Sequence, residues 1–249
     1  MIYFVGAGAG APDLITVRGQ ALLRRADRVV HAGSLVNPEL LRECPKSCEI
    51  LDSAGMTLEE VIDSLVGADK AGHIVVRLHT GDPSIFGAIR EQMDALRQRN
   101  RAFEIVPGVS SLCAAAAALQ AEYTLPGVSQ TVIISRVAGR TPVPEAESIR
   151  ALAAHGATMA LFLSASMLDT LCAELICGGY APDTPAALVY KASWPDEKVI
   201  RGTLGTLPQM GRAIGKTALV LVGRFLQGDY QKSKLYDASF SHGYREAKR

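Results

Sequence analysis

Three glycine-bearing segments of the chain could hold a bound ligand, and each follows a short apolar run typical of a β-strand. They are Gly6-Ala-Gly-Ala-Gly-Ala11, His79-Thr-Gly-Asp-Pro-Ser84 and Val106-Pro-Gly-Val-Ser-Ser111. Glycine lets a backbone approach a ligand closely, and open α/β sheets bind ligands beyond the carboxyl ends of their strands. Three such segments in one half of the chain therefore indicate a shared ligand pocket.

The second and third segments also have a simpler structural explanation. Asp82 followed by Pro83 is a common way to begin a helix, and Ser110 suits the same capping role. Helix capping by Asp82 does not require the glycine before Asp82-Pro83, Gly81, or the one after it, Gly87. Ligand binding is therefore the favoured interpretation.

The first segment formally fits the G-x-G-x-x-G/A pattern of dinucleotide-binding enzymes, which makes a nicotinamide-dependent oxidoreductase one alternative. Pro12-Asp13 delays the expected helix to Leu14, so no helix N-terminus lies within the turn to receive a pyrophosphate. The expected second strand, Arg28–His31, is not followed by the acidic residue that would bind a ribose. A non-catalytic nucleotide-binding module is the other alternative.

Taken together, the three segments resemble the class III S-adenosylmethionine-dependent methyltransferases that modify tetrapyrroles. Three later stretches are similar to the branch of that family that methylates precorrin-4 at ring carbon 11 on the way to cobalamin. These stretches are Thr131–Arg136 with Gly139–Glu145, Leu161–Ser164 and Val189–Glu197. The resemblance runs from residue 1 to about residue 225. It departs at Ala9, where the family commonly has proline.

The resemblance implies a fold, a cofactor and a substrate. The fold is α/β, the tetrapyrrole methylase fold, with two α/β domains and a cofactor cleft between them, usually in a homodimer. The cofactor is S-adenosyl-L-methionine, and the reaction converts precorrin-4 to precorrin-5. Cobalt-precorrin-4 of the anaerobic route is the alternative substrate. The cofactor-binding residues that it implies are Ala9, Thr80, Gly81, Asp82, Ile85, Ser110, Ser111, Leu163, Ala192, Thr217 and Ala218.

Methyl transfer from a sulfonium to carbon is an in-line displacement, so the protein must mainly position its reactants. The sequence does not identify a catalytic residue. The candidates for a general base are His79, Tyr190 and Asp82. The substrate's acetate and propionate arms call for cationic partners. The candidates are Arg136, Arg140, Lys191 and His31. Trp194, the only tryptophan, either stacks on the macrocycle or packs a loop.

The alternation of apolar runs and helical patterns predicts how these residues are positioned. Strands that alternate with helices imply a parallel sheet covered on both faces. Helices are expected at Leu14–Ala26 and Ile85–Arg99, and a capping box at Thr57-Leu-Glu-Glu60 opens another. A break around Pro126-Gly127 divides the chain into predicted domains at 1–121 and 122–249.

Composition narrows the class of protein. The 249 residues are 48% hydrophobic and carry a net charge of +1, which argues against a general nucleic-acid binder. No apolar run is long enough to predict a membrane span. Five cysteines, with no signal peptide expected, indicate reduced thiols in a cytoplasm. Their spacing lacks a zinc pattern, so no metal site is expected.

Overall fold

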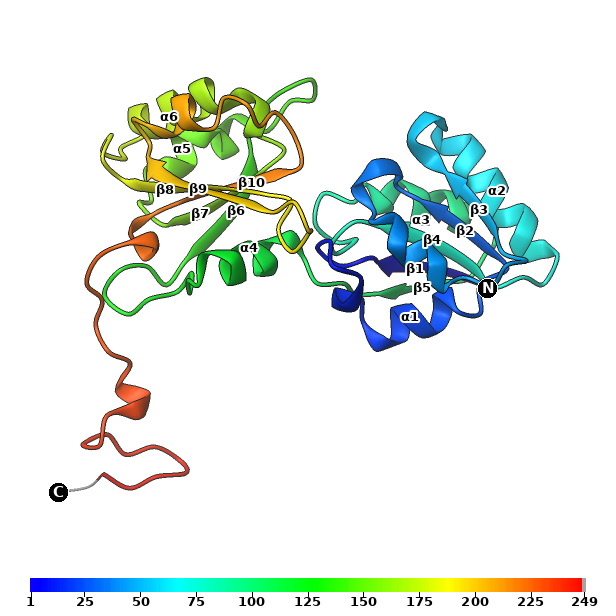
Figure 1. Ribbon diagram of the computed structural model, residues 1–249, viewed down its shortest axis with the longest axis horizontal. Helices are drawn as coiled ribbons and strands as arrows, with labels where there is room; N and C mark the ends of the chain where they lie inside the picture. The colour runs from blue at the N-terminus through cyan, green and yellow to red at the C-terminus, as the bar shows by residue number, and fades with distance from the viewer. Residues whose placement is uncertain (248–249) are drawn as a thin grey trace. The chain divides into compact units, whose positions relative to one another are not determined.

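The computed structural model describes residues 1–247, apart from the side chain of Ser34. It forms two compact units, of which the first comprises Met1–Ala115 with Lys191–Glu197 and the second Ala116–Tyr190 with Lys198–Arg249. Each unit contains a five-stranded sheet (Figure 1). The predicted division of the chain into domains at 1–121 and 122–249 stays a prediction. Residues 248 and 249, at the end of the second predicted domain, lie outside the described part of the chain.

The first unit is built on a sheet in the order β3-β2-β4-β1-β5. Every pairing in it is parallel, as the alternating pattern predicted. The strands are β1 (Ile2–Gly6), β2 (Arg28–His31), β3 (Glu49–Asp52), β4 (Val75–His79) and β5 (Phe103–Val106). The helices are α1 (Val17–Leu23), α2 (Leu58–Lys70) and α3 (Ile89–Gln98).

Apolar side chains cover both faces of this sheet, which is the usual condition of parallel strands. Phe4 of β1 packs with Leu65 of α2 and Leu96 of α3 on one face. Val5 of the same strand packs with Leu23 of α1 on the other. Successive residues of a strand point to opposite faces, so this single short strand supplies both layers of the core.

Helix α2 begins as the sequence predicts, whereas α1 and α3 are shorter. The Thr57 and Glu60 side chains form the reciprocal capping box at the start of α2. Helix α3 begins at Ile89 because Phe86 and Ala88 adopt positive φ angles of 53° and 49°, which a right-handed helix cannot contain. The turn before α3 therefore stays available to line the end of β4.

The second unit has a mixed sheet in the order β6-β7-β10-β8-β9. Only β6 and β7 are parallel, while β10 and β9 run antiparallel to their neighbours. The strands are β6 (Val132–Arg136), β7 (Thr158–Phe162), β8 (Pro185–Tyr190), β9 (Lys198–Thr203) and β10 (Ala218–Val222). The helices are α5 (Ile149–Ala153), α6 (Leu168–Cys177) and α7 (Leu207–Met210), and α4 (Ser111–Leu119) crosses the boundary between the units.

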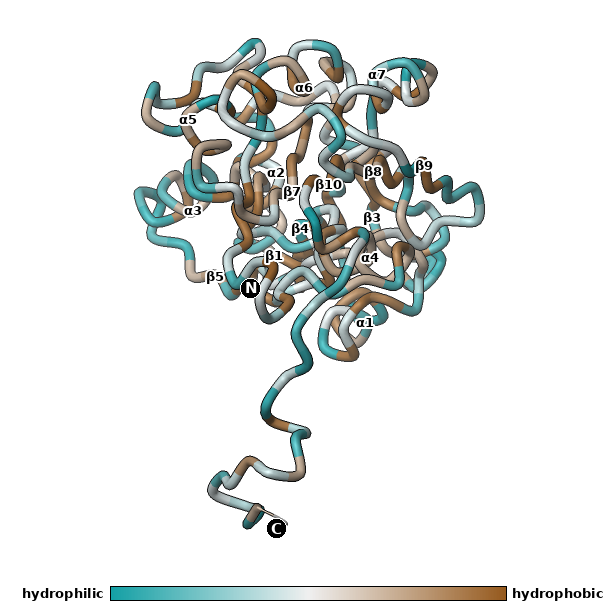
Figure 2. Tube along the Cα trace, turned by 90° about the vertical axis from the view of Figure 1, so that its left-hand side faces the viewer, coloured by the Kyte–Doolittle hydropathy of each residue, from teal (hydrophilic) through white to brown (hydrophobic). Residues whose placement is uncertain are grey.

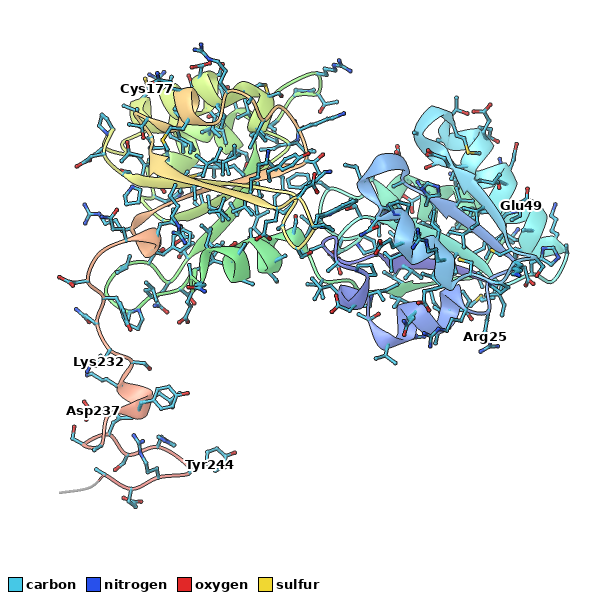
Figure 3. The ribbon with its side chains drawn as sticks, in the orientation of Figure 1. Arg25, Glu49, Cys177, Lys232, Asp237 and Tyr244 are labelled. Carbon is cyan, nitrogen blue, oxygen red and sulfur yellow. The ribbon has the colours of Figure 1, made fainter. Side chains whose placement is uncertain are left out.

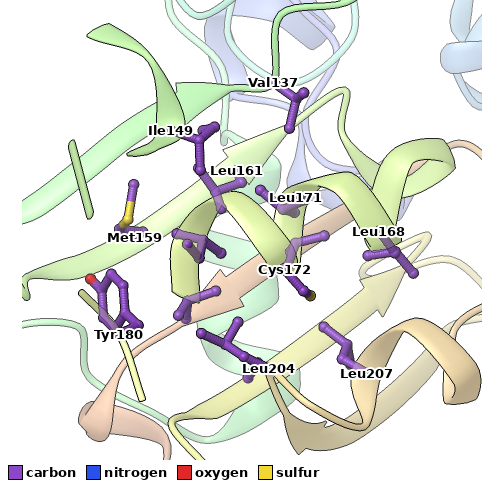
Figure 4. Close-up of a cluster of buried hydrophobic side chains, with 14 of the residues drawn as sticks. Val137, Ile149, Met159, Leu161, Leu168, Leu171, Cys172, Tyr180, Leu204 and Leu207 are labelled. Carbon is purple, nitrogen blue, oxygen red and sulfur yellow. The ribbon is translucent and has the colours of Figure 1, made fainter. Parts of the chain in front are cut away.

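The core of the second unit lies on the face of its sheet that α5, α6 and α7 cover. Met159 and Leu161 of β7 meet Leu171 of α6 and Leu207 of α7 in this cluster (Figure 4). All four side chains are fully buried. The strands of both sheets are largely hydrophobic, whereas the C-terminal segment after Leu226 is mostly polar (Figure 2).

Two surface features lie outside these cores. Tyr244, near the C-terminus, is 99% exposed (Figure 3). The five cysteines are all free thiols, of which Cys177 and Cys113 are exposed. Burial, reinforced by the neighbouring Cys48, raises the pKa of Cys44 to about 12, so this thiol stays protonated and is a poor nucleophile.

Candidate functional site

The three glycine-bearing segments meet at one edge of the first sheet. Strand β1 lies between β4 and β5, and its register aligns Gly6 with His79 and Val5 with Val106. All three strands therefore end at the same level, and the segments that follow them are neighbours (Figure 1). This edge is the carboxyl end of a parallel sheet, where α/β proteins bind ligands.

Glycines allow these loops to touch backbone to backbone. A Cβ atom at Gly6 would lie 2.5 Å from the Gly108 Cα and 2.6 Å from the Gly81 carbonyl oxygen. A Cβ atom at Gly108 would overlap the same oxygen. Larger residues at Gly6 and Gly108 would push the loops apart, so their glycines are required by close packing.

Gly81 is required for a different reason. Its φ angle is +59°, while a Cβ atom there would make only ordinary contacts at 3.7 Å with Ser110 and Ser111. The Gly81 N–H donates to the Gly8 carbonyl at 2.9 Å, and the Gly8 N–H donates back to the Gly81 carbonyl at 3.3 Å. The first and second loops are thereby joined like two short strands.

Asp82 joins the second loop to the third. Its Oδ2 accepts the Gly108 N–H at 2.8 Å, and its Oδ1 accepts the Ser84 N–H at 2.8 Å and the Ser84 hydroxyl. Burial alone would raise the pKa of Asp82, but these hydrogen bonds outweigh it and hold that pKa below its usual range. The carboxylate is thus already engaged in loop structure, and it begins no helix.

The remaining predicted residues of the first unit surround this junction. Thr80 is exposed, Ile85 and Ser111 are half-buried, and Ser110 is buried. The Ile85 N–H donates to the Asp82 carbonyl at 3.3 Å, and the Ser110 hydroxyl accepts the Leu112 N–H at 3.2 Å. The first unit therefore brings its predicted cofactor residues together.

Ala9 belongs to a loop that is held by residues the sequence did not assign to it. The Trp194 Nε1–H donates to the Ala9 carbonyl at 3.2 Å, and the Asn37 amide donates to the Gly10 carbonyl at 2.8 Å. The Ser193 hydroxyl accepts the Ala11 N–H at 3.0 Å. Ser193 and Trp194 lie in a stretch that carries the family resemblance, whereas no sequence signal pointed to Asn37.

His79 is unsuited to act as a base near neutral pH. It is 4% exposed and stacks on Phe4 with ring centroids 6.0 Å apart. Burial, assisted by the positive charge of Arg77, lowers the pKa of His79 to about 3. The imidazole is therefore neutral over the physiological range, and it is a buried polar neighbour of the second loop.

The predicted residues of the second unit gather at one edge of its own sheet. Leu163 directly follows β7, and Ala218 begins β10, the antiparallel neighbour of β7. Leu163 and Thr217 both adopt left-handed backbone conformations, with φ angles of 53° and 56°. Ala192 lies in the segment Lys191–Glu197, whose contacts group it with the first unit.

Two of the four cationic candidates for substrate binding are engaged within the protein. Arg136 donates to the Thr141 carbonyl at 3.1 Å and the Pro142 carbonyl at 2.8 Å, which shapes its own loop. Lys191 pairs with Asp196 at 2.7 Å. His31 lies at the site edge of the first sheet, paired in register with Leu78, and Arg140 is exposed.

A pocket in the second unit lies apart from the predicted residues. It measures about 250 Å³ and is lined by Ser129, Thr158, Tyr180 and Arg224, among others. Within residues 1–247, no three His, Cys, Asp or Glu side chains gather as a metal site would require. No helix in that range has the length and apolar character needed to cross a membrane.

Comparison with known proteins identifies the family. Residues 1–208 match the model of the Tetrapyrrole (Corrin/Porphyrin) Methylases. The chain is 54% identical to the cobalt-precorrin-4 C(11)-methyltransferase of Methanocaldococcus jannaschii, over 99% of this chain and 96% of the relative. It is 47% identical to the precorrin-4 C(11)-methyltransferase of Rhodococcus erythropolis, over 96% of this chain and 97% of the relative.

Solved structures agree with the sequence comparison. The X-ray structure of a cobalt precorrin-4 methyltransferase superposes with a TM-score of 0.89 at 48% identity, covering 91% of this chain and 96% of that one. The uroporphyrin-III C-methyltransferase of Thermus thermophilus, complexed with S-adenosylhomocysteine, gives a TM-score of 0.76 at 26% identity, with coverage of 91% and 93%. Nothing in these comparisons supports a nicotinamide-dependent oxidoreductase. The chain belongs to the tetrapyrrole methylase family of S-adenosylmethionine-dependent methyltransferases.

Proposed function

We propose that the protein transfers a methyl group from S-adenosylmethionine to ring carbon 11 of precorrin-4, in its cobalt-bearing or metal-free form. The observation that carries this proposal is the junction of Gly6, Gly81 and Gly108 at the carboxyl edge of the first sheet. Because glycines form this closely packed junction, few side chains block the approach of a ligand to the backbone. The names of these two relatives support the substrate and the position of methylation.

The donors at this edge suit the cofactor. Among residues 1–247, the backbone N–H groups of Ala9 and Gly10 have no hydrogen-bond partner. Thr80, an exposed residue of the second loop, adds a hydroxyl group. The amino-acid carboxylate and ribose oxygens of the cofactor accept hydrogen bonds from such groups. When bound, the cofactor supplies the electrophilic methyl group.

We keep the full predicted set of cofactor contacts as part of this proposal. In the first unit, the closeness of Gly81 to Ser110 and Ser111 and the hydrogen bond from Gly108 to Asp82 support it. In the second unit, support comes from the left-handed backbone of Leu163 and Thr217, because strained non-glycine residues cluster at functional sites. The set is Ala9, Thr80, Gly81, Asp82, Ile85, Ser110, Ser111, Leu163, Ala192, Thr217 and Ala218.

The protein's own contribution to the reaction is to bind and orient. An electron-rich ring carbon attacks the methyl group in line, so no nucleophile on the enzyme is required. The lowered pKa of His79 removes it as a base. Asp82 is occupied by Ser84 and Gly108, which leaves Tyr190, at the end of β8, as the remaining candidate of the three.

We also propose that the protein is a cytoplasmic homodimer. The family resemblance implies the dimer, and five free cysteines suit a reducing compartment. Light scattering of the purified protein tests the oligomeric state directly. A mass equal to one chain at micromolar concentration contradicts the dimer without affecting the proposed reaction.

The reaction is tested by incubating the protein with methyl-labelled S-adenosylmethionine and either precorrin-4 or cobalt-precorrin-4. NMR of the product locates the new methyl group, which we expect at ring carbon 11. Comparing the two substrates at equal concentration identifies the preferred form. Methylation at another carbon, or tight NAD binding without S-adenosylhomocysteine binding, overturns the proposal.

A further inference from the structure

The connection between β8 and β9 is a segment of the first unit. Strands β8 and β9 are paired in the second sheet, yet the residues that join them, Lys191–Glu197, pack with the first unit. Within that unit, Ser193 and Trp194 contact the glycine-rich loop that follows β1. The segment therefore brings two side chains to a loop far away in sequence.

This connecting segment is braced for that contact. Lys191 pairs with Asp196 at 2.7 Å and lies 5.1 Å from the centroid of the Trp194 ring. The Ser193 N–H donates to a Glu197 carboxylate oxygen at 2.6 Å. Lys191 and Ser193 both hold positive φ angles, of 46° and 67°. Such conformations persist only where the surroundings impose them.

Trp194 fixes one peptide of the glycine-rich loop. A trans peptide points its carbonyl and its N–H in opposite directions. Because the indole binds the Ala9 carbonyl, the N–H of Gly10 in the same peptide must point away from the indole. Gly10 cannot carry a side chain, since a Cβ atom there would overlap the Trp194 ring.

The neighbouring peptides are fixed in the same way. The Gly81 N–H binds the Gly8 carbonyl at 2.9 Å, which turns the Ala9 N–H away from Gly81. Asn37, which is 5% exposed, binds the Gly10 carbonyl at 2.8 Å, and the following N–H, of Ala11, donates to Ser193. Every carbonyl from Gly8 to Gly10 is therefore bound, while the two N–H groups of Ala9 and Gly10 are left for a ligand.

We propose that Trp194 is a positioning residue, which binds the Ala9 carbonyl so that the N–H groups of Ala9 and Gly10 are presented to a ligand carboxylate. Trp194 acts through this loop and does not itself contact the ligand. The inference rests on the proposed function. The carboxylate belongs either to the amino-acid part of the cofactor or to an acetate or propionate arm of the macrocycle.

The test compares Trp194→Phe with Pro195→Ala. The phenylalanine keeps an aromatic ring but removes the N–H donor, whereas Pro195 is an exposed neighbour that has no N–H to donate. Calorimetry measures binding of S-adenosylhomocysteine and of 5′-methylthioadenosine, which lacks the amino-acid part. Steady-state kinetics measures KM and kcat for precorrin-4.

We expect Trp194→Phe to weaken binding of one carboxylate-bearing ligand about tenfold, with 5′-methylthioadenosine affinity and kcat unchanged. Weaker S-adenosylhomocysteine binding assigns the carboxylate to the cofactor. A higher KM for precorrin-4, with unchanged S-adenosylhomocysteine binding, assigns it to the macrocycle. Pro195→Ala should match the natural protein in every assay.

Equal weakening of all ligands together with a lower melting temperature, or no change in any of them, overturns the inference. If Trp194→Phe does not fold, Ser193→Ala removes the acceptor of the Ala11 N–H and should give the same pattern. Binding of S-adenosylhomocysteine without methylation of any precorrin contradicts the proposed function only, because the calorimetric comparison still applies. Trp194 is the only tryptophan, so its fluorescence should shift on titration with the ligand concerned.

Discussion

The Gly108 N–H donates to the Asp82 carboxylate across 2.8 Å, and this bond ties the loop after β4 to the loop after β5. The same carboxylate binds Ser84 within its own loop. Asp82 thus joins two loops of the candidate site to each other. Its hydrogen bonds hold two backbone segments at a fixed separation.

Replacing Asp82 should therefore affect both stability and cofactor affinity. Asp82→Ala removes a charged acceptor from Gly108 and Ser84, and we expect about tenfold weaker S-adenosylhomocysteine binding with a lower melting temperature. Asp82→Asn keeps one carbonyl oxygen, so it should lose less cofactor affinity and less thermal stability than Asp82→Ala. Calorimetry and thermal unfolding measure the two effects. Asp94→Asn, which breaks only exposed pairs with Arg90 and Arg97, serves as the control and should change neither appreciably.

A methyl group added at Gly108 should abolish cofactor binding, whereas a methyl group added at Gly67 in α2 should stabilise the protein. Gly108→Ala places a Cβ atom on the Gly81 carbonyl, so the loops must separate and cofactor binding should be lost. Gly67 is an exposed residue inside α2 with no atom near its Cβ position. Gly67→Ala should therefore raise the free energy of unfolding by about 1 kcal/mol. Chemical denaturation and S-adenosylhomocysteine binding distinguish the two, and equal behaviour would refute the close packing.

The conformation of Gly81 predicts an unusual order of tolerance. Because the space around its Cβ position is ordinary and its φ angle is +59°, the cost of substitution comes from the backbone. Asparagine adopts left-handed conformations far more readily than a β-branched residue. Gly81→Asn should therefore keep more methyltransferase activity and a higher melting temperature than Gly81→Val. The reverse order would show that steric bulk decides the outcome at this position.

The buried neutral state of His79 should make the protein less stable as the pH falls. The pKa of His79 is about 3 in the folded protein and about 6.5 in the unfolded chain, so only the unfolded state takes up a proton between these values. Because of this proton uptake, the free energy of unfolding should be about 2 kcal/mol lower at pH 5 than at pH 7.

Denaturant titrations at several pH values measure this dependence. His79→Leu should flatten the curve between pH 5 and pH 7, because no imidazole remains to be protonated in the unfolded chain. His155→Leu, at an exposed position, should leave the curve unchanged. A His79→Leu protein with the natural pH dependence would assign the loss of stability to other groups.

The sequence by itself indicated most elements of the first unit and the positions of its loops, although strand β3 was not predicted. Apolar runs such as Ile2–Val5 form strands because most of their side chains are buried by neighbours whatever the details of packing. The capping box of Thr57 and Glu60 is local, so four residues were enough to predict it. The glycines at Gly6, Gly81 and Gly108 marked the candidate site because the strands they follow had to end together.

Only the tertiary structure decided what those loops hold on to. The helix after Asp82 begins later than its sequence pattern predicts, because left-handed residues at Phe86 and Ala88 interrupt it. Asp82 itself binds Gly108, and Trp194 binds Ala9 from a segment 185 residues away in the chain. Hydrogen bonds between distant residues leave no periodic trace in a sequence, because they depend on which loops the folded sheet places side by side.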